Sequence, residues 1–281
     1  MKITTLVDNS RLDSRKDLAV ERGLSLHIET ASTQLLFDAG NGRTFCDNAL
    51  LLDINIAEVD LVVLSHRHHD HCNGITHFVN INHKAKVYMR ECEDKDYYFQ
   101  AYGFKTNVGL NKTILERNAH RMELIKNTTE IAPSVHLITQ IERKYPQPAG
   151  NQYLYTQSKQ GIERDTFDHE LILVIEEVDG LVIFTGCAHS GVLNMIETVV
   201  NLFPKQKIKA VVGGFHLVGL PIFNSIGGTK HDIEAVAKAL AEYPIVRFYT
   251  GHCTGMKAYT ILKRVLGDRL EHIPTGRCVS I

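Results

Sequence analysis

The fold is most constrained by short apolar runs, rich in Val and Ile, that alternate with helical patterns. Residues 59–66 (VDLVVLSH) form a continuous apolar run with polar residues at its end, which is typical of a strand buried on both faces. Residues 170–186 (ELILVIEEVDGLVIFTG) predict a hairpin that turns at Asp179-Gly180. Three later segments predict amphipathic helices between strands: residues 190–203, 230–243 and 255–267. We therefore expect an α/β protein whose two halves have a similar order of elements.

Length and composition are those of an average globular protein. The chain has 281 residues, of which 44% are apolar and 22% charged, so a sizeable core can form. The formal net charge of −1, without long runs of one sign, gives no indication of nucleic-acid or membrane-surface binding. Because no linker or repeat is evident, we expect a single domain over residues 1–281, with an irregular, aromatic-rich insertion at about residues 92–161.

Cysteine usage and hydropathy bear on the compartment. The six cysteines include no C-x-x-C pair, which is typical of reduced thiols. No apolar run approaches the length of about 18 residues expected of a membrane span, and the first ten residues read as a strand. We therefore expect a cytoplasmic protein that acts on a small molecule, without a nucleic-acid or membrane partner. A homodimer is left open.

Four histidines and an aspartate lie within residues 64–74 (LSHRHHDHCNG), directly after a predicted strand. Their spacing is His66-x-His68-x-Asp70-His71. Open α/β sheets place ligand sites at the carboxyl ends of strands, and imidazole with carboxylate suits zinc, iron and similar ions. His66 and His68 can point the same way, whereas Asp70 and His71 turn toward a different point. One segment can thus serve two ions; the alternative is a solvated histidine-rich loop.

Further ligands must come from elsewhere in the chain. Three later histidines follow predicted strands among small residues: His189, His216 and His252. Because the neighbouring glycines permit close backbone approach, we expect His189 and His252 to be ligands and His216 to be a ligand or a substrate contact. The alternative for each is a structural histidine.

Four more residues are weaker candidates. Cys187 is either a thiolate ligand or a small buried residue. Asp168 and His169 compete as ligands or as a pair that supports a ligand. Asp38, at the end of a predicted strand, either forms a turn or accepts a ring N–H from a liganding histidine.

These motifs together resemble the metallo-β-lactamase superfamily. The residues that carry the resemblance, which covers nearly the whole chain, are Asp38, His66, His68, Asp70, His71 and Gly251-His252. It implies an αββα sandwich, in which two mixed sheets pack face to face with helices outside and hold a dinuclear metal site at one edge. The segments FTGCAHSG, VVGGFHL and GHCTG are similar to a subgroup described as like 7,8-dihydropterin-6-methyl-4-(β-D-ribofuranosyl)aminobenzene-5'-phosphate synthase.

The resemblance also implies roles for these residues. The first ion would be held by His66, His68 and His189, and the second by Asp70, His71 and His252. Many members carry Gly-Asp where this chain has Gly186-Cys187, so the bridging carboxylate is missing and His189 is the expected replacement. Asp70 would also orient the nucleophile, and His216 would donate to a developing oxyanion. Zinc is the default metal, with manganese and iron as alternatives.

Two activities follow from the resemblance. The first is a metal-dependent hydrolase, in which two divalent ions and a metal-bound hydroxide attack a small phosphoester or acyl ester. The second is a metal-dependent group transferase of the dihydropterin–ribofuranosylaminobenzene phosphate synthase type. Five aromatic residues would then stack on a flat heterocycle, or, in the interpretation we favour, pack within a loop: Tyr97, Tyr98, Phe99, Tyr102 and Phe104. Ser225–Asp232 (SIGGTKHD) offers a weak anion site before a helix.

Two other classes are disfavoured. Di-iron oxygen or nitric oxide reductases typically place a glutamate where this chain has His68, and they carry an added flavin domain. A non-catalytic metal-binding protein would leave the open coordination positions unused.

Overall fold

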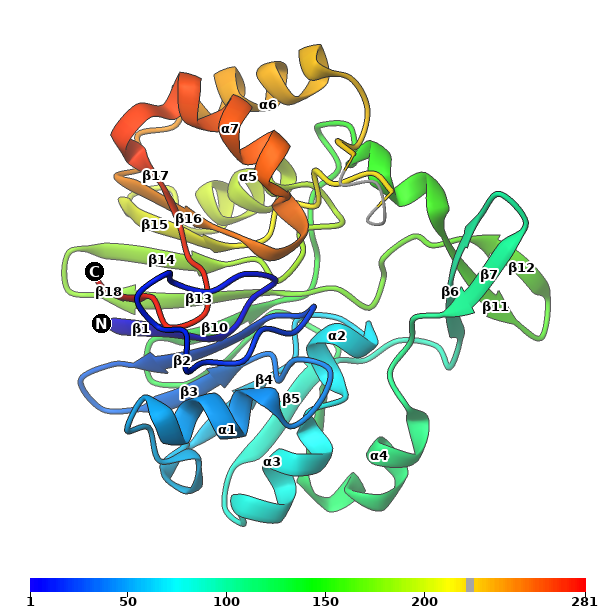
Figure 1. The fold of residues 1–281 in the computed structure, drawn as a ribbon, viewed down its shortest axis with the longest axis vertical. Helices are drawn as coiled ribbons and strands as arrows, with labels where there is room; N and C mark the ends of the chain where they lie inside the picture. The colour runs from blue at the N-terminus through cyan, green and yellow to red at the C-terminus, as the bar shows by residue number, and fades with distance from the viewer. Residues whose placement is uncertain (221–224) are drawn as a thin grey trace. The chain divides into compact units, whose positions relative to one another are not determined.

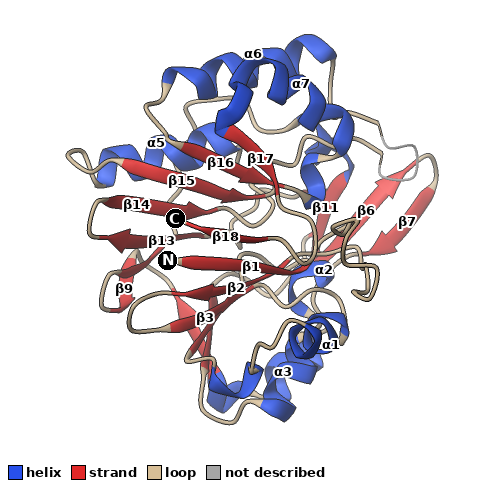
Figure 2. Cartoon of the chain, turned by 60° about the vertical axis from the view of Figure 1, so that its left-hand side comes forward, coloured by secondary structure: helices blue, strands red, loops and turns tan. Residues whose placement is uncertain are grey.

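A computed structural model describes residues 1–220 and 225–281. Among them, no helix combines the length and apolarity that a membrane span requires. The chain divides into two compact units. Unit 1 comprises Met1–Lys126, Tyr155–Glu163 and Ile273–Ile281, and unit 2 comprises Asn127–Leu154 and Arg164–His272. Each unit contains one seven-stranded sheet with helices packed on it (Figures 1 and 2). The single domain expected over residues 1–281 stays a prediction.

The main sheet of unit 1 has the order β18-β1-β2-β3-β4-β5-β8. Its strands are β1 (Lys2–Val7), β2 (Ser25–Glu29), β3 (Gln34–Phe37), β4 (Leu61–Val63), β5 (Lys86–Arg90), β8 (Met122–Ile125) and β18 (Cys278–Ser280). Neighbours from β18 to β3 pair antiparallel, and neighbours from β3 to β8 pair parallel. The carboxyl ends of β3 and β4 therefore meet at the same edge of the sheet.

The helices of unit 1 cover the sheet through a shared apolar core. They are α1 (Thr44–Leu51), α2 (His69–Cys72), α3 (Ile75–Ile81) and α4 (Lys112–Arg117), with short 3-10 turns at η1 (Ile56–Glu58) and η2 (Ala119–Arg121). Phe45 of α1 and Phe78 of α3 are fully buried against Leu36 and Val62 of the sheet. Burying each phenylalanine contributes about 1.5–3 kcal/mol.

A smaller sheet of unit 1 joins two segments far apart in the sequence (Figure 1). Its order is β12-β11-β6-β7, with β6 (Asp96–Ala101), β7 (Phe104–Asn107), β11 (Leu154–Ser158) and β12 (Gly161–Arg164). The expectation that residues 92–161 are irregular is therefore wrong. All residues of β7 and β12 are exposed, so neither strand shows the alternation by which a half-buried strand is recognised.

The sheet of unit 2 has the order β17-β16-β15-β14-β13-β10-β9. Its strands are β9 (Thr129–Ala132), β10 (Val135–Ile138), β13 (Ile172–Glu177), β14 (Gly180–Phe184), β15 (Ile208–Gly213), β16 (Arg247–Thr250) and β17 (Leu270–His272). The strands from β14 to β17 are parallel and the others antiparallel, as in unit 1. The predicted hairpin is confirmed as β13–β14, and the similar order of elements in the two halves is confirmed.

The helices of unit 2 pack on this sheet. They are α5 (Val192–Leu202), α6 (Lys230–Glu242) and α7 (Met256–Leu266), with 3-10 turns at η3 (Ala149–Tyr153), η5 (His252–Thr254) and η6 (Gly267–Arg269). Ile196, Leu240 and Leu262, one from each helix, are fully buried in a core that includes Phe248 of β16. The three predicted helices are thus present, and the α/β class is confirmed.

Candidate metal centre

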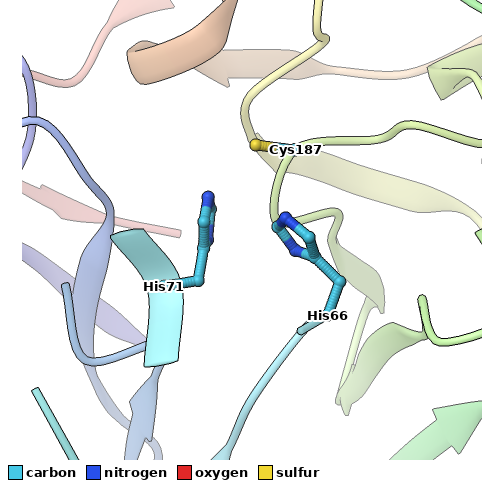
Figure 3. A group of neighbouring side chains, drawn as sticks. All are labelled: His66, His71 and Cys187. Atoms are coloured by element: carbon cyan, nitrogen blue, oxygen red, sulfur yellow. The ribbon is translucent and has the colours of Figure 1, made fainter. Parts of the chain in front are cut away.

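The histidines of unit 1 follow the carboxyl ends of its parallel strands, as expected. Asp38 comes directly after β3, His66 lies on the loop after β4, and His71 lies on α2 (Figure 3). All three side chains have 0% exposure. The rings of His66 and His71 are 4.2 Å apart between centroids. Polar groups buried to this degree must be held by partners, because an unsatisfied one is costly.

A hydrogen-bond network fixes the two rings. Oδ2 of Asp38 accepts from Nδ1 of His71 at 2.6 Å and from the hydroxyl of Ser65 at 2.7 Å. Because that hydroxyl has one proton, its oxygen must accept from Nδ1–H of His66, which lies 2.8 Å away. Both histidines therefore carry their ring proton on Nδ1. Their Nε2 atoms keep the lone pairs that a metal ion requires.

His68 brings a third nitrogen to the same place. Its Nδ1 lies 3.0 Å from Nε2 of His66 and donates to it, because the proton of His66 is on Nδ1, and the side chain is 5% exposed. Two imidazole ligands of one tetrahedral zinc ion would hold their nitrogens about 3.3 Å apart, given Zn–N bonds of about 2.0–2.1 Å. The spacing of this pair thus fits ligation of one ion.

A segment that the sequence did not single out supports this loop. His68 forms an antiparallel bridge with Gly109. The amide of His69 donates to the carbonyl of Val108 at 2.8 Å, and the amide of Leu110 donates to the carbonyl of Arg67 at 2.8 Å. Only the pairing of the folded chain reveals that residues 108–110 hold the histidine loop.

The end of the histidine segment depends on a close backbone approach. A Cβ at Gly74 would lie 1.9 Å from the carbonyl oxygen of Ala39, so no other residue fits. Asp70 is partly exposed, with Oδ2 3.9 Å from Nε of Arg22. His69 instead contacts Asn41, with 2.9 Å between Nδ1 and Oδ1, and burial lowers its pKa.

In unit 2, His189 lies in the loop between β14 and α5 and is 1% exposed. Its Nδ1 lies 3.1 Å from Oδ1 of Asn151, whose amide nitrogen donates back to the His189 carbonyl at 2.8 Å. The amides of His189 and Ser190 each donate to the carboxylate of Glu170 at 2.7 Å. Burial raises the pKa of Glu170 although these hydrogen bonds oppose the shift. Sequence reasoning missed both Asn151 and Glu170, which lie far from His189 in the chain.

The other candidates of unit 2 follow neighbouring parallel strands. Cys187 lies on the loop after β14 (Figure 3), His216 after β15, and His252 after β16. The ligand atoms of Cys187, His189 and His216 lie within 4.8 Å of one another, as do those of Cys187, His252 and Cys253. Burial raises the pKa of the Cys253 thiol, but contacts with Cys187, His216 and His252 outweigh burial and bring it well below the ordinary value.

The roles predicted for Asp168 and His169, as ligands or as a pair that supports a ligand, stay predictions. Nε2 of His169 lies 3.1 Å from Oδ2 of Asp165, and both of these side chains are buried. Asp168 is partly exposed. The sequence does not predict the contact between Asp165 and His169. Residues four apart are expected to meet only in a helix, and this segment is not helical.

The aromatic segment is divided between two environments. Tyr97 is 3% exposed and lies edge-on to His68, with 6.2 Å between ring centroids. Tyr102 and Phe104, at the turn between β6 and β7, are each 80% exposed. The five aromatic residues therefore do not all pack within a loop, because two of them are exposed.

The suggested anion site before α6 is filled by the chain itself. The carboxylate of Asp232 accepts from the amide of Thr229 at 2.7 Å and from its hydroxyl at 2.8 Å. This capping box places a negative charge where an anion would bind. An external phosphate would have to compete with that carboxylate.

The donor set of unit 1 therefore fits a metal ion: three buried histidines lie together, and the proton positions of two are fixed by a buried carboxylate and a serine. Unit 2 has buried histidine and cysteine donors of its own. Such nitrogen and sulfur ligands suit zinc, iron and related ions.

A family model described as the metallo-beta-lactamase superfamily matches residues 20–193. The chain is 27% identical over 276 residues to 7,8-dihydropterin-6-methyl-4-(beta-D-ribofuranosyl)-aminobenzene-5'-phosphate synthase of Methanocaldococcus jannaschii. The alignment covers 92% of this chain and 90% of that protein. A crystal structure described as a metal-dependent hydrolase of the beta-lactamase superfamily is 27% identical, with a TM-score of 0.83 and coverage of 100% and 99% of the two chains.

A more distant structure shares the fold alone. Zn(2+)-bound PqqB from Methylobacterium extorquens is 11% identical, with a TM-score of 0.62 and full coverage of both chains. Together these comparisons confirm the resemblance and the fold class inferred from the sequence.

Proposed function

Because the chain belongs to the metallo-β-lactamase superfamily, we propose that it is a metal-dependent hydrolase of a small phosphoester or acyl ester. The observation that carries the proposal is the network of Asp38 and Ser65 with His66 and His71. It leaves an Nε2 lone pair on each of two buried imidazoles. Two neighbouring buried histidines whose Nδ1 protons are held by partners and whose Nε2 atoms keep their lone pairs are typical of metal ligands, not of histidines with a structural role alone.

The proposed ligands are those expected from the sequence. They are His66, His68, Asp70 and His71 of unit 1, with His189 and His252 of unit 2, for two divalent ions, zinc by default. Bound divalent ions supply Lewis acidity, which makes water more acidic and polarises an ester oxygen. The cytoplasmic location, the absence of a nucleic-acid or membrane partner and the oligomeric state stay predictions.

Other side chains would act on the substrate or on the ligands. Asp38 holds the ring of His71 by its Nδ1–H, and Asn151 holds that of His189. We assign Asp70 to orienting the nucleophile. We assign His216 to donating to the oxygen on which charge develops. Among the described residues, the buried Nδ1 of His216 has no hydrogen-bond partner, and this unsatisfied donor position supports the assignment.

Elemental analysis of the purified protein, in metal equivalents per chain, is the first test. About two equivalents are expected for the dinuclear centre. The loaded protein is then assayed with phosphodiesters, thioesters and lactones, with the His68→Ala variant as the inactive control. One equivalent or fewer, or hydrolysis that survives in His68→Ala, would contradict the proposal.

The alternative is a synthase, which the 27% identity to the dihydropterin synthase of Methanocaldococcus jannaschii favours. In this reaction a carbon nucleophile would displace pyrophosphate from a pterin pyrophosphate. Mass spectrometry of reactions with and without an aromatic amine acceptor separates the two activities. A coupled product together with released pyrophosphate supports the synthase, whereas addition of water alone supports the hydrolase.

A further inference from the structure

Two cysteines of unit 2 lie beside His252. Cys187 follows β14, and Cys253 directly follows His252 after β16. Because β14, β15 and β16 are parallel neighbours, their carboxyl ends meet at one edge of the sheet. The two sulfur atoms and a ring nitrogen of His252 all lie within 4.8 Å of one another, and the three residues are 3–7% exposed.

The loop after β15 makes room for one of these sulfurs. A Cβ at Gly214 would lie 2.4 Å from Sγ of Cys253, so any side chain at position 214 would displace the thiol. The amide of Gly214 donates to the carbonyl of Gly186 at 2.6 Å, which ties this loop to the one that carries Cys187. Sγ of Cys253 in turn lies 3.5 Å from the carbonyl oxygen of Cys187. The sulfur thus lies in a tightly defined position.

Two ordinary explanations account poorly for this arrangement. All six cysteines are reduced in the structure, so Cys187 and Cys253 are not joined in a disulfide. Packing of small apolar groups explains one buried thiol. It does not explain why a second thiol and an imidazole nitrogen converge on the first. The ligand atoms of His189 and His216 also lie within 4.8 Å of Sγ of Cys187.

We propose that Cys187, His252 and Cys253 form a thiolate-bearing metal site. Two thiolates and an imidazole select Zn²⁺ or Fe²⁺ over Mn²⁺ or Mg²⁺, because the latter ions prefer oxygen ligands. Two thiolates on one tetrahedral zinc ion lie about 3.8 Å apart, given Zn–S bonds of about 2.3 Å. Because the two sulfur atoms lie within 4.8 Å of each other, small side-chain rotations would bring them to that distance. The inference rests on the proposed function, since His252 belongs to the same proposed centre, and it adds the class of metal.

Cobalt substitution tests the site without an assay of activity. Co²⁺ bound by thiolate absorbs in the near ultraviolet through sulfur-to-metal charge transfer, whereas imidazole and carboxylate ligands give no such band. The protein loaded with Co²⁺ should show the band. It should fall by about half in Cys253→Ser and in Cys187→Ser, since each removes one of two sulfur ligands. Cys278→Ser, at an exposed cysteine of β18, is the matched control and should leave the band unchanged.

A second measurement uses the unaltered chain, in case a variant fails to fold. X-ray absorption at the zinc edge of the unaltered, zinc-loaded protein should show sulfur ligands at about 2.3 Å. Cobalt binding without the charge-transfer band, an unchanged band in Cys253→Ser, or a zinc edge that shows nitrogen and oxygen ligands alone would overturn the thiolate site. If metal content and hydrolysis still depend on His68, the proposed function stands without it. If no metal binds at all, both proposals fail.

Discussion

Nδ1 of His71 lies 2.6 Å from Oδ2 of Asp38, and both side chains are fully buried in unit 1. A charge-assisted hydrogen bond of this length orients the ring and increases the basicity of its other nitrogen. Since Oδ2 of Asp38 also accepts from Ser65, which in turn contacts His66, one carboxylate orders two histidines. Asp38 should therefore control metal affinity without being a ligand.

Replacing Asp38 by Asn tests this control. The variant should fold, because Asn tolerates the left-handed backbone that Asp38 adopts at φ +60°. Its metal affinity should fall by about 10–100-fold, as is typical when a partner of a liganding histidine is lost. Chelator competition measures the dissociation constant. Asp47→Asn, at an exposed residue of α1, should leave it unchanged, and an unchanged affinity in Asp38→Asn would refute the assignment.

Replacing His68 by Ala should remove most of the bound metal while the protein stays folded. The reason is that Nδ1 of His68 lies 3.0 Å from Nε2 of His66, as two ligands of one ion would. Metal equivalents per chain and far-ultraviolet circular dichroism are measured together. His136→Ala serves as the control, because His136 contacts Glu176 at 2.6 Å in β13 and has no place among the proposed ligands. Full metal content in His68→Ala would show that the loop is merely histidine-rich.

Asn151 should act as a positioning residue for His189. Its side chain both contacts Nδ1 of the ring and donates to the backbone carbonyl of His189, so Asn151→Ala should weaken metal binding by about tenfold. Asn151→Asp keeps the acceptor for the ring and should restore part of the loss. Asn201→Ala, at an exposed residue that contacts Glu142, should have no effect. If the Ala and Asp variants bind metal equally, the ring contact has no role.

Native-state alkylation should distinguish two cysteines of unit 1. Burial raises the pKa of Cys46 to about 12, so at pH 8 only about one molecule in 10⁴ has the reactive thiolate. Cys278 is exposed. Iodoacetamide at pH 8 should therefore label Cys278 in the folded protein and Cys46 only after denaturation, as measured by peptide mass spectrometry. Early labelling of Cys46 would mean that α1 opens readily.

Glu197 of α5 should stabilise the fold in a pH-dependent way. Hydrogen bonds from Lys144 and then from the Tyr243 hydroxyl lower the pKa of Glu197 below its ordinary value of 4.5. A lowered carboxyl pKa means that the stabilisation is present above the unfolded-state pKa and is lost as pH falls through the folded-state value.

The matching variant is Glu197→Gln. It should cost about 1 kcal/mol or less at pH 7, because water screens the partly exposed Lys144 pair. The cost should shrink as the pH is lowered below 4. Urea unfolding at both pH values gives the difference. Glu234→Gln, at an exposed pair with Lys230 in α6, should change little at either pH. A cost that is equal at both pH values would show that the charge of Glu197 is not responsible.

Several features were determined by the sequence alone because their causes are local. The apolar run at residues 59–66 and the turn at Asp179-Gly180 give β4 and the β13–β14 hairpin directly. Likewise, His66, His216 and His252 each follow a strand, so the parallel pairing within each unit brings them to a carboxyl edge. Periodicity, turn residues and position after a strand act over a few residues, and a sequence shows them plainly.

Other features were decided only by the tertiary structure. The sequence does not indicate that Asn151 holds His189, that Asp165 contacts His169, or that residues 108–110 support the histidine loop. Each of these contacts depends on how the chain returns to itself, and β6 and β11 pair across more than fifty residues without a pattern in either segment. Buried polar atoms form hydrogen bonds with whichever partner the packed fold brings within reach. Chain closure and packing determine that partner, and local propensities, which act over a few residues, do not.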